Sequence, residues 1–458
     1  MAHVFISAAH KSSGKTTLTL GLAAALARRG LAVQPFKKGP DYIDPMWLSL
    51  AAGRPCRNLD FHLMTRDEIR ASFARHARAA DVSLIEGNKG LYDGLDLHGS
   101  NSNAALAALL GSPVVLVIDA RGMTRGIAPL ILGYQAFDPS IRIAGVILNN
   151  LGGARHEQKL RAVIAHYTGV AVIGAVPHDE KIAIVERHLG LVPSNEAAAS
   201  VGVVEAVREL IEQSVDLERL LAIAASAAPL PAPLAEPAPA SAPRGAPRLR
   251  VGIARDAAFG FYYADDLEAL AEAGADLVPI DTLRAERLPA IDALVIGGGF
   301  PETQMRALEA NEGLRRDLAR AIEAGLPVYA ECGGLMYLAR TISWQGETAR
   351  MVGALPGDAV MHARPVGRGY ARLEGTPDAS WLPGGEGEIA AHEFHYASLD
   401  NLPQGLRYAY RVARGHGVDG ARDGIVHRNV LASFCHLRGA GERGWVAPFV
   451  EFARRRAA

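Results

Sequence analysis

Two groups of residues in this chain have the types and spacing needed for chemistry. Residues 12–17 read SSGKTT, the pattern of a loop that binds phosphate. In such a loop, backbone N–H groups and a helix N-terminus hold the phosphates, a Lys reaches the terminal ones, and a Ser or Thr hydroxyl ligates Mg²⁺. The second group is Cys332 within residues 331–334, ECGG, a candidate thiol nucleophile on a turn. Together they predict two coupled reactions in one enzyme.

The phosphate loop predicts ATP binding with Mg²⁺. Gly14, Lys15 and Thr16 fit the three roles, and Thr17 completes the motif. Ala9 stands where the first glycine of the standard pattern is expected. The alternative interpretation is a polar turn, but an apolar strand before the loop and a helix after it favour the nucleotide site.

Acidic residues near the predicted sheet edge are candidates for metal and substrate binding. Glu86 ends the apolar run 82–85, and ligands bind at the carboxyl ends of parallel strands. We expect Glu86 to bind Mg²⁺ with Thr16, and Asp93 to contact substrate. The alternative for Asp93 is a turn residue before Gly94.

The segment 37–45, KKGPDYIDP, places two carboxylates in a loop that contains two prolines. Such a loop could hold Mg²⁺ between ATP and a substrate carboxylate, so we assign Asp41 to the metal, and Asp44 and Lys38 to the substrate. The alternative is a solvated turn. Asn149, which follows the apolar run 143–148, is predicted to read the adenine edge of the nucleotide.

The second site requires a base and an oxyanion site around Cys332. Small residues after the thiol let the backbone turn sharply, and the bare backbone at Gly298 and Gly299 suits N–H donation to an oxyanion. His436, at the end of an apolar run, is the predicted base. The alternatives are a buried structural thiol at Cys332 and a zinc site using Cys435 with the histidines of the HEFHY segment. No second cysteine pair supports zinc. Cys435 is adjacent to His436 and would point to the opposite face of a strand, so it is predicted to be core.

The pattern of apolar runs predicts two α/β domains, each a mainly parallel sheet covered by helices. Continuous Val/Ile/Leu runs are typical of parallel strands buried on both faces. They occur at 4–7, 82–85, 114–118 and 143–148, and again at 249–254, 293–296, 327–330 and 430–434. Between the two sets, residues 224–247 are rich in Pro and Ala and cannot form a core. We therefore predict a first domain with the phosphate loop at 1–223, a linker at 224–247 and a second domain with the Cys-His pair at 248–458.

Composition indicates a globular cytoplasmic protein. The chain has 458 residues, of which 49% are hydrophobic and 21% charged, with a formal net charge of -1. This balance gives no electrostatic reason to expect nucleic acid or an anionic membrane as partner. Three cysteines suggest a reducing compartment, and neither a signal peptide nor a long apolar run is evident. A homodimer is compatible with the sequence.

These motifs together resemble the cobyrinate (or hydrogenobyrinate) a,c-diamide synthase family, in which an ATP domain related to dethiobiotin synthetase is joined to a class I glutamine amidotransferase domain. The resemblance covers nearly the whole chain. It rests on residues 12–17, 39–45 (GPDYIDP), 86–94 (EGNKGLYDG), 297–302 (GGGFPE), 331–334, 393–396 (EFHY) and 433–436 (SFCH).

The resemblance implies a specific reaction. Cys332, activated by His436, would release ammonia from glutamine, while Mg-ATP phosphorylates acetate carboxylates of a corrinoid acid that ammonia then converts to amides. Glu86, Asp41, Asp44 and Asp93 match acidic positions of the family. Commoner class I amidotransferases carry Glu two residues beyond the histidine, whereas this chain has Arg438. The third group is therefore open, with Glu393 as a candidate.

Three other assignments remain open at this point. Cobyric acid synthase acts on other carboxylates of the same ring, and CTP synthase joins the same two domain types. A different class would be a phosphate-loop ATPase switch carrying an inactive amidotransferase-like module. The 39–45 loop and the intact Cys332 and His436 favour the diamide synthase.

Overall fold

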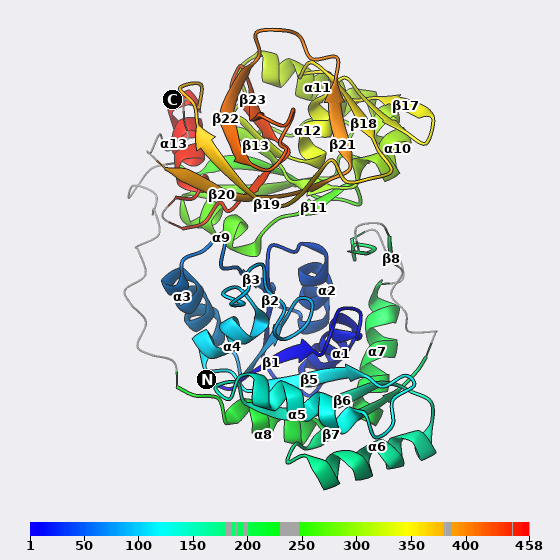
Figure 1. The fold of residues 1–458 in the computed structure, drawn as a ribbon. Helices are drawn as coiled ribbons and strands as arrows, with labels where there is room; N and C mark the ends of the chain where they lie inside the picture. The colour runs from blue at the N-terminus through cyan, green and yellow to red at the C-terminus, as the bar shows by residue number, and fades with distance from the viewer. Residues whose placement is uncertain are drawn as a thin grey trace. The chain divides into compact units, whose positions relative to one another are not determined.

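The computed structural model describes residues 1–179, 186–187, 190–195, 200–229, 247–379, 381, 387–441 and 443–457. The chain divides into two compact units, Met1–Glu236 and Pro237–Ala458 (Figure 1). The division falls within the segment predicted as a linker. Most of that segment lies outside the described residues, and its first two residues complete a helix, so the linker stays a prediction.

The first unit is built on a seven-stranded sheet in the order β3-β2-β4-β1-β5-β6-β7, and every neighbouring pair is parallel. Its strands are β1 His3–Ala8, β2 Val33–Lys38, β3 Arg57–Leu59, β4 Val82–Glu86, β5 Val114–Asp119, β6 Ile143–Leu151 and β7 Val172–Pro177. A separate short pair is formed by β8 Glu186–Arg187 and β9 Gly190–Leu191. Because β1 lies between β4 and β5, the loop after β1 and the residue that ends β4 share one sheet edge.

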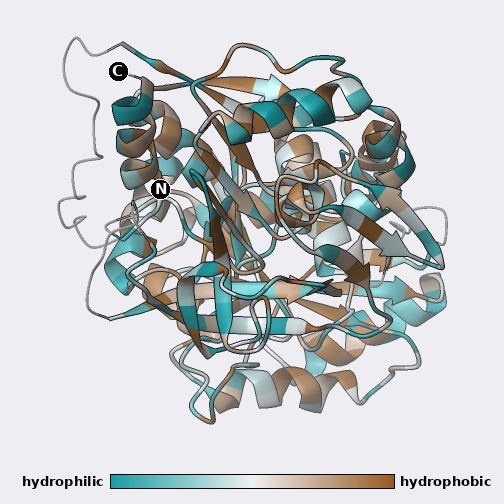
Figure 2. Ribbon diagram, turned by 90° about the horizontal axis from the view of Figure 1, so that it is seen from above, coloured by the Kyte–Doolittle hydropathy of each residue, from teal (hydrophilic) through white to brown (hydrophobic). Residues whose placement is uncertain are grey.

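Helices cover both faces of this sheet. One face carries a core formed with α3 Arg66–Ala77, α4 Asn103–Leu110, α5 Ile127–Phe137 and α6 Ala154–Tyr167. The remaining helices are α1 Lys15–Arg28, α2 Ile43–Ala52, α7 Ser200–Ser214 and α8 Leu217–Ala225, and α1 packs against both α2 and α7. Figure 2 shows helices banded in brown and teal, as expected where one side of a helix is buried.

The second unit contains a ten-stranded sheet in the order β12-β10-β13-β15-β24-β23-β22-β19-β20-β25. The first five strands are parallel, and the rest pair antiparallel. These strands are β10 Leu249–Ala254, β12 Ala275–Ile280, β13 Ala293–Ile296, β15 Val328–Glu331, β19 Gly367–Gly375, β20 Glu388–His395, β22 Arg407–Arg414, β23 Arg422–His427, β24 Val430–Ser433 and β25 His436–Leu437. Smaller sheets are formed by β11 Phe259–Phe261 with β14 Gly298–Gly299, and by β16 Thr341–Trp344, β17 Glu347–Arg350, β18 Asp358–Met361 and β21 Ala397–Asp400.

Two hydrophobic cores flank the large sheet of this unit. One includes α10 Met305–Ala310, α11 Glu312–Glu323 and α12 Gly333–Leu338, and the short 3₁₀ helix η2 Pro301–Gln304 precedes α10. The other includes α9 Ala264–Glu272 and α13 Val446–Ala457. Val328 and Ala330 of β15 face the first core and Tyr329 faces the second, which follows from the alternation of side chains along a strand.

Both units have the predicted α/β class, and every apolar run named from the sequence matches, lies within or overlaps a strand. The antiparallel half of the second sheet was not predicted. In the described part of the chain, no helix combines the length and apolarity that a bilayer crossing requires.

Candidate functional site

The phosphate loop joins β1 to α1 in the first unit, as the sequence predicted. Gly14 precedes the first residue of α1 with a φ of 86°, in the left-handed region. Asn149, two residues before the end of β6, donates from Nδ2 to the Ser13 carbonyl over 3.0 Å. A Cβ added at Gly14 would lie 2.2 Å from that same Nδ2 atom. The Asn149 amide therefore holds the loop, while adenine recognition by this residue stays a prediction.

Lys15 begins α1 and is largely buried, with 8% of its surface exposed. Burial lowers the pKa of Lys15 to about 8, against the opposing charge of Glu86. Thr17 lies in the first turn of the same helix. Lys15 lies at the start of the helix that follows the loop, where it can contact a bound polyanion. The negative charge of such a ligand would favour the protonated form of Lys15.

Thr16 lies at the centre of a buried charged cluster. Its hydroxyl donates to Glu86 Oε1 over 2.7 Å and is 3.3 Å from Asp44 Oδ2. Lys37 bridges the same two oxygens, with Nζ 2.5 Å from Asp44 and 2.8 Å from Glu86. Four different elements supply this cluster: α1 carries Thr16, β2 carries Lys37, the first turn of α2 carries Asp44, and Glu86 ends β4. β2 and β4 are neighbours in the sheet, with Lys37 opposite Glu86.

The electrostatics of this cluster are set by burial and by Lys37. Burial would raise the pKa of Asp44, but the charge of Lys37 and its hydrogen bond outweigh burial and hold that pKa below its usual range. Burial raises the pKa of Glu86 despite the same lysine. Burial also opposes charge on Lys37, yet both carboxylates together raise its pKa. Glu86 Oε2 is fully buried and has no hydrogen-bond partner among the described residues.

The two aspartates of the 37–45 loop differ in position from what the sequence suggested. Asp41 Oδ1 accepts from the backbone N–H groups of Ile43 and Asp44, so it stabilises the start of α2. Burial, reinforced by the charge of Asp44, raises the pKa of Asp41 to about 7. Asp44, assigned from sequence to the substrate, is the aspartate that contacts Thr16. The geometry therefore favours exchanging the two roles.

The remaining predicted residues of this unit line the same edge. Lys38 is buried and donates to Asn88 Oδ1 over 3.1 Å. Burial lowers the pKa of Lys38 to about 8, against the charge of Asp60. Asp93 is exposed and accepts from the Gly90 N–H over 2.8 Å, which is the turn role considered as its alternative. The sequence analysis singled out Lys38, whereas the lysine that contacts both Asp44 and Glu86 is Lys37.

Cys332 occupies a sharp turn in the second unit. It follows β15 and precedes α12, with φ 47° and ψ -101°, a conformation that side chains other than glycine rarely adopt. Its N–H donates to the Ser433 carbonyl of β24 over 2.7 Å. A Cβ added at Gly334 would lie 2.3 Å from the Ile296 carbonyl oxygen, so the second glycine is needed for close approach. The predicted turn around the thiol is thus present.

His436, the predicted base, begins β25 and hydrogen-bonds to the Cys332 side chain. Its Nδ1 donates to Glu331 Oε2 over 3.0 Å, and both residues are buried. Burial opposes charge on this histidine, but the hydrogen bonds and charges of Cys332 and Glu331 outweigh burial and raise the pKa of His436 to about 10. The structure therefore favours the imidazolium form of His436 beside the thiol at neutral pH.

The glycines predicted as oxyanion donors lie against these two residues. Gly298 and Gly299 form β14, and a Cβ added at Gly298 would lie 2.8 Å from His436 Cε1. A Cβ added at Gly333 would lie 3.1 Å from the backbone nitrogen of Gly299. The predicted oxyanion segment is therefore adjacent to the turn that holds Cys332, and its catalytic role stays a prediction.

One idea from the sequence about the surroundings of His436 requires correction. Glu393, the candidate third group, accepts from the backbone N–H groups of His416 and Gly417, and its Oε2 is 3.6 Å from His395. Arg438 donates to the Ala440 carbonyl. The carboxylate that contacts His436 is Glu331, which the sequence had shown only as a neighbour of the thiol. Cys435 is fully buried in the core, as predicted.

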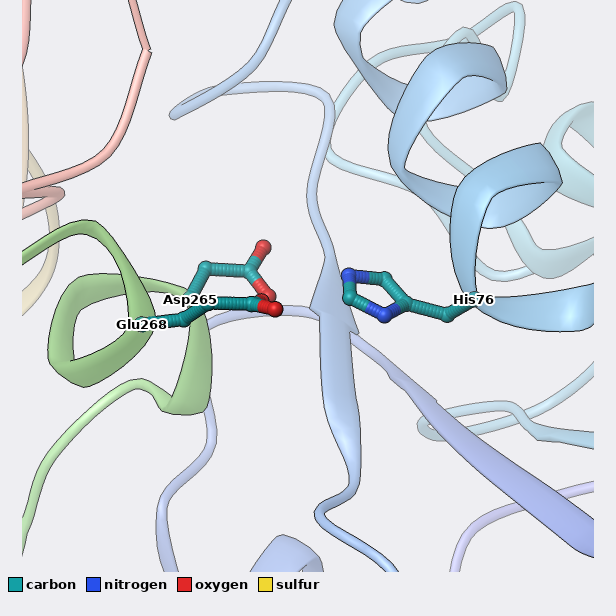
Figure 3. Close-up of side chains that lie close together, drawn as sticks. All are labelled: His76, Asp265 and Glu268. Atoms are coloured by element: carbon teal, nitrogen blue, oxygen red, sulfur yellow. The ribbon is translucent and has the colours of Figure 1, made fainter. Parts of the chain in front are cut away.

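Asp265 and Glu268, near the start of α9, are one helical turn apart (Figure 3). Asp265 also lies 3.9 Å from Arg438. Figure 3 also draws His76, from the last turn of α3. His76 belongs to the first compact unit, and Asp265 and Glu268 belong to the second.

Comparison with protein families assigns a class to each unit. Residues 5–192 match the CobQ/CobB/MinD/ParA nucleotide binding domain, and residues 250–443 match the CobB/CobQ-like glutamine amidotransferase domain. A nucleotide-binding domain and a glutamine amidotransferase domain in one chain define a ligase that takes its amide nitrogen from glutamine.

Relatives of nearly equal length identify the family. The cobyrinate a,c-diamide synthase of Magnetococcus marinus is 49% identical over 98% of this chain and 96% of its own. Those of Methanosarcina acetivorans and Archaeoglobus fulgidus are 44% and 39% identical, over 98% and 99% of this chain and 95% and 98% of theirs. The chain belongs to the cobyrinate a,c-diamide synthase family.

Proposed function

We propose that this protein uses ATP and glutamine to convert the a and c acetate carboxylates of cobyrinate or hydrogenobyrinate into amides. The proposal rests on family membership together with one structural observation. The Cys332 side chain hydrogen-bonds to His436 in the same chain that gathers Thr16, Asp44 and Glu86 beside a phosphate loop. A nucleophile and a phosphoryl-transfer site are the two parts that this reaction needs.

The glutaminase half follows from the chemistry of the thiol. Cys332 sulfur adds to the carboxamide carbon of glutamine, and His436 carries the thiol proton to the departing nitrogen. The C–N bond breaks to give ammonia and a thioester, which water hydrolyses to glutamate and the free thiol. The backbone N–H groups near Gly298 and Gly299 are proposed to stabilise the oxyanion of the tetrahedral intermediate.

The synthetase half activates a carboxylate that ammonia alone does not attack. The γ-phosphoryl group of ATP moves to a carboxylate oxygen of the corrinoid acid, giving an acyl phosphate and ADP. Ammonia then adds to the acyl carbon and phosphate leaves, which produces the amide. Lys15 is proposed to contact the terminal phosphates, where their negative charge would favour its protonated form.

Thr16, Asp44 and Glu86 fit a magnesium site. Carboxylate and hydroxyl oxygens are the ligands this hard cation prefers, and Glu86 Oε2 is a buried oxygen without a partner among the described residues. When bound with ATP, Mg²⁺ would neutralise charge that builds up on the phosphates. Lys37 supplies positive charge at the same oxygens, and Lys38 and Asp93 are proposed to contact the corrinoid acid.

The proposed partners are small molecules, namely glutamine, ATP and a corrinoid acid. We also expect a cytoplasmic location and no nucleic-acid partner, and a homodimer remains compatible with the chain. The contact between Cys332 and His436 argues against a phosphate-loop switch carrying an inactive amidotransferase module. No observation favours cobyric acid synthase.

The test compares nitrogen donors in the wild type and in Cys332→Ala. The wild type should form ADP in a manner that depends on cobyrinic or hydrogenobyrinic acid, with either glutamine or ammonium chloride as donor. Cys332→Ala should keep the ammonia-dependent reaction and lose the glutamine-dependent one. ADP formation at the same rate with and without the corrinoid acid and the nitrogen donor would refute the proposal and support the phosphate-loop ATPase switch.

A further inference from the structure

Glu331 is the residue immediately before the nucleophile, and it is 6% exposed. Tyr329 and Glu331 are two residues apart on β15, so they belong to the same side of the strand, and Glu331 is the last residue of that strand. From this end position its Oε2 reaches His436 Nδ1 at 3.0 Å. Because Nδ1 donates to a carboxylate, the other ring nitrogen of His436 is left for the thiol of Cys332.

We propose that Glu331 is the positioning residue of the Cys332–His436 pair, the role that a separate carboxylate has in a catalytic triad. The inference rests on the proposed glutaminase activity. Glu331 does not touch the reacting carboxamide in this account. It acts through His436, by fixing which ring nitrogen carries a proton and by stabilising the imidazolium that forms.

The other oxygen of Glu331 is held by two further donors, which prevents the carboxylate from turning away. Oε1 accepts from the Tyr329 hydroxyl over 2.6 Å and from the backbone N–H of Leu437 over 3.0 Å. Tyr329 is itself fixed by stacking on Trp445, with ring centroids 4.0 Å apart. The bond to Leu437 also ties the strand that carries His436 to the end of β15. A reacting group held this way has little freedom to leave its productive orientation.

The strand pairing explains why a neighbour of the thiol can have this role. β15 and β24 pair with Glu331 opposite Ser433, and the chain then runs on to His436 in β25, which pairs with β20 instead. Phe434 and Cys435 donate their backbone N–H groups to Asp423 of β23. The next two residues then meet Glu331 at the end of β15, His436 through Nδ1 and Leu437 through its backbone N–H.

The other ionisable groups around the pair have separate partners. Glu393 binds backbone amides, and Asp266 Oδ1 accepts from the backbone N–H groups of Gly439 and Ala440. His392 stacks on His436 at 4.9 Å between ring centroids and lies near the Tyr263 hydroxyl. None of these side chains places a carboxylate on His436 in the described contacts, whereas Glu331 does.

The experiment uses the full chain and the isosteric variant Glu331→Gln. A glutamine amide can still accept from Tyr329 and Leu437 through its oxygen, but it presents an N–H₂ group to His436 Nδ1. The imidazole would then be forced into the tautomer in which the nitrogen facing the thiol already carries hydrogen. Glutaminase kcat should fall by about 10²-fold or more, with KM changed by less than about threefold.

Two further variants separate positioning from folding. Glu331→Asp keeps the charge but shortens the reach, so it should lose less activity than Glu331→Gln, and it carries the test if the Gln variant does not fold. Glu393→Gln is the matched control, a buried carboxylate of the same unit that binds backbone amides and should keep kcat within about threefold of the wild type.

A second readout does not require turnover. Iodoacetamide labels the thiolate, and peptide mass spectrometry after digestion measures the rate at Cys332 alone. At pH 7 the rate should fall at least about tenfold in Glu331→Gln and remain unchanged in Glu393→Gln. Equal kcat and equal labelling in wild type and Glu331→Gln, or a change in KM alone, would overturn the inference. A wild type without glutaminase activity would instead refute the proposed function, and labelling would still test the pair.

Discussion

Replacing Gly14 by alanine should weaken ATP binding, because this position has two independent requirements for glycine. Its φ of 86° is in the left-handed region, where a Cβ is strained. An added Cβ would also lie 2.2 Å from Asn149 Nδ2, the atom that donates to the Ser13 carbonyl. The substitution should therefore move both the loop and the amide that holds it.

The expected loss of ATP binding free energy follows from the backbone strain and the displaced hydrogen bond. A single residue other than glycine held in the left-handed region costs about 1 to 2 kcal/mol. Displacing the Asn149 amide loses one hydrogen bond to the loop, worth about 1 kcal/mol. If ATP requires the loop conformation seen here, Gly14→Ala should weaken binding by about 2 to 3 kcal/mol, which is roughly 30- to 150-fold.

A double-mutant cycle separates the two terms. Isothermal titration with Mg-ATP on the wild type, Gly14→Ala, Asn149→Ala and the double variant gives four affinities. Asn149→Ala removes the atom that the Cβ of Ala at position 14 would contact. The double variant should therefore lose about 1 kcal/mol less binding free energy than the two single variants lose together. Wild-type affinity in Gly14→Ala, or strict additivity in the cycle, would refute this reasoning.

Three further substitutions test the electrostatics and the helix ends. Burial raises the pKa of Asp266 to about 7 from 3.8, so stability present at pH below 3.8 is lost as pH rises through 7. The stability of Asp266→Asn relative to the wild type should therefore increase from pH 4 to pH 8, by at most about 4 kcal/mol. Thermal unfolding at several pH values measures this, and a difference between the two proteins that stays constant with pH would contradict it. Lys37→Met leaves the carboxylates of Asp44 and Glu86 buried without a counter-charge, so it should lower the free energy of unfolding by about 3 kcal/mol or more. Added Mg²⁺ should raise the thermal midpoint of this variant more than that of the wild type. An equal rise in both proteins would contradict a cation site at these carboxylates. Thr65→Ala removes the capping box of α3 and should cost about 1 kcal/mol in denaturant unfolding, whereas no loss would show that the cap contributes nothing.

The strand ends that carry the main site residues were predictable from sequence. Glu86 directly follows an apolar run, and Cys332 and His436 each come two residues after one, so parallel pairing of those runs places them at sheet edges. The phosphate loop was predictable because its motif lies between a strand and a helix. Local patterns of this kind depend on neighbours in the sequence, which is why they could be read without the structure.

The features that the sequence did not determine depend on pairing between distant segments. Lys37 and Lys38 are adjacent, and only the position of β2 beside β4 decides which lysine meets Glu86. The contact of Glu331 with His436 requires the chain to cross from β24 to β25. The antiparallel strands, such as β19, expose one side and lack continuous apolar runs, so their pattern was not recognised.

The most direct test of the central claim is the product itself. The purified protein is incubated with Mg-ATP and glutamine and with cobyrinic acid, hydrogenobyrinic acid or no acceptor, while ADP and product mass are followed together. The account predicts acceptor-dependent ADP and a mass change of two carboxylate-to-amide conversions with at least one acceptor. An unchanged acceptor mass, with ADP release the same in all three incubations, would contradict it.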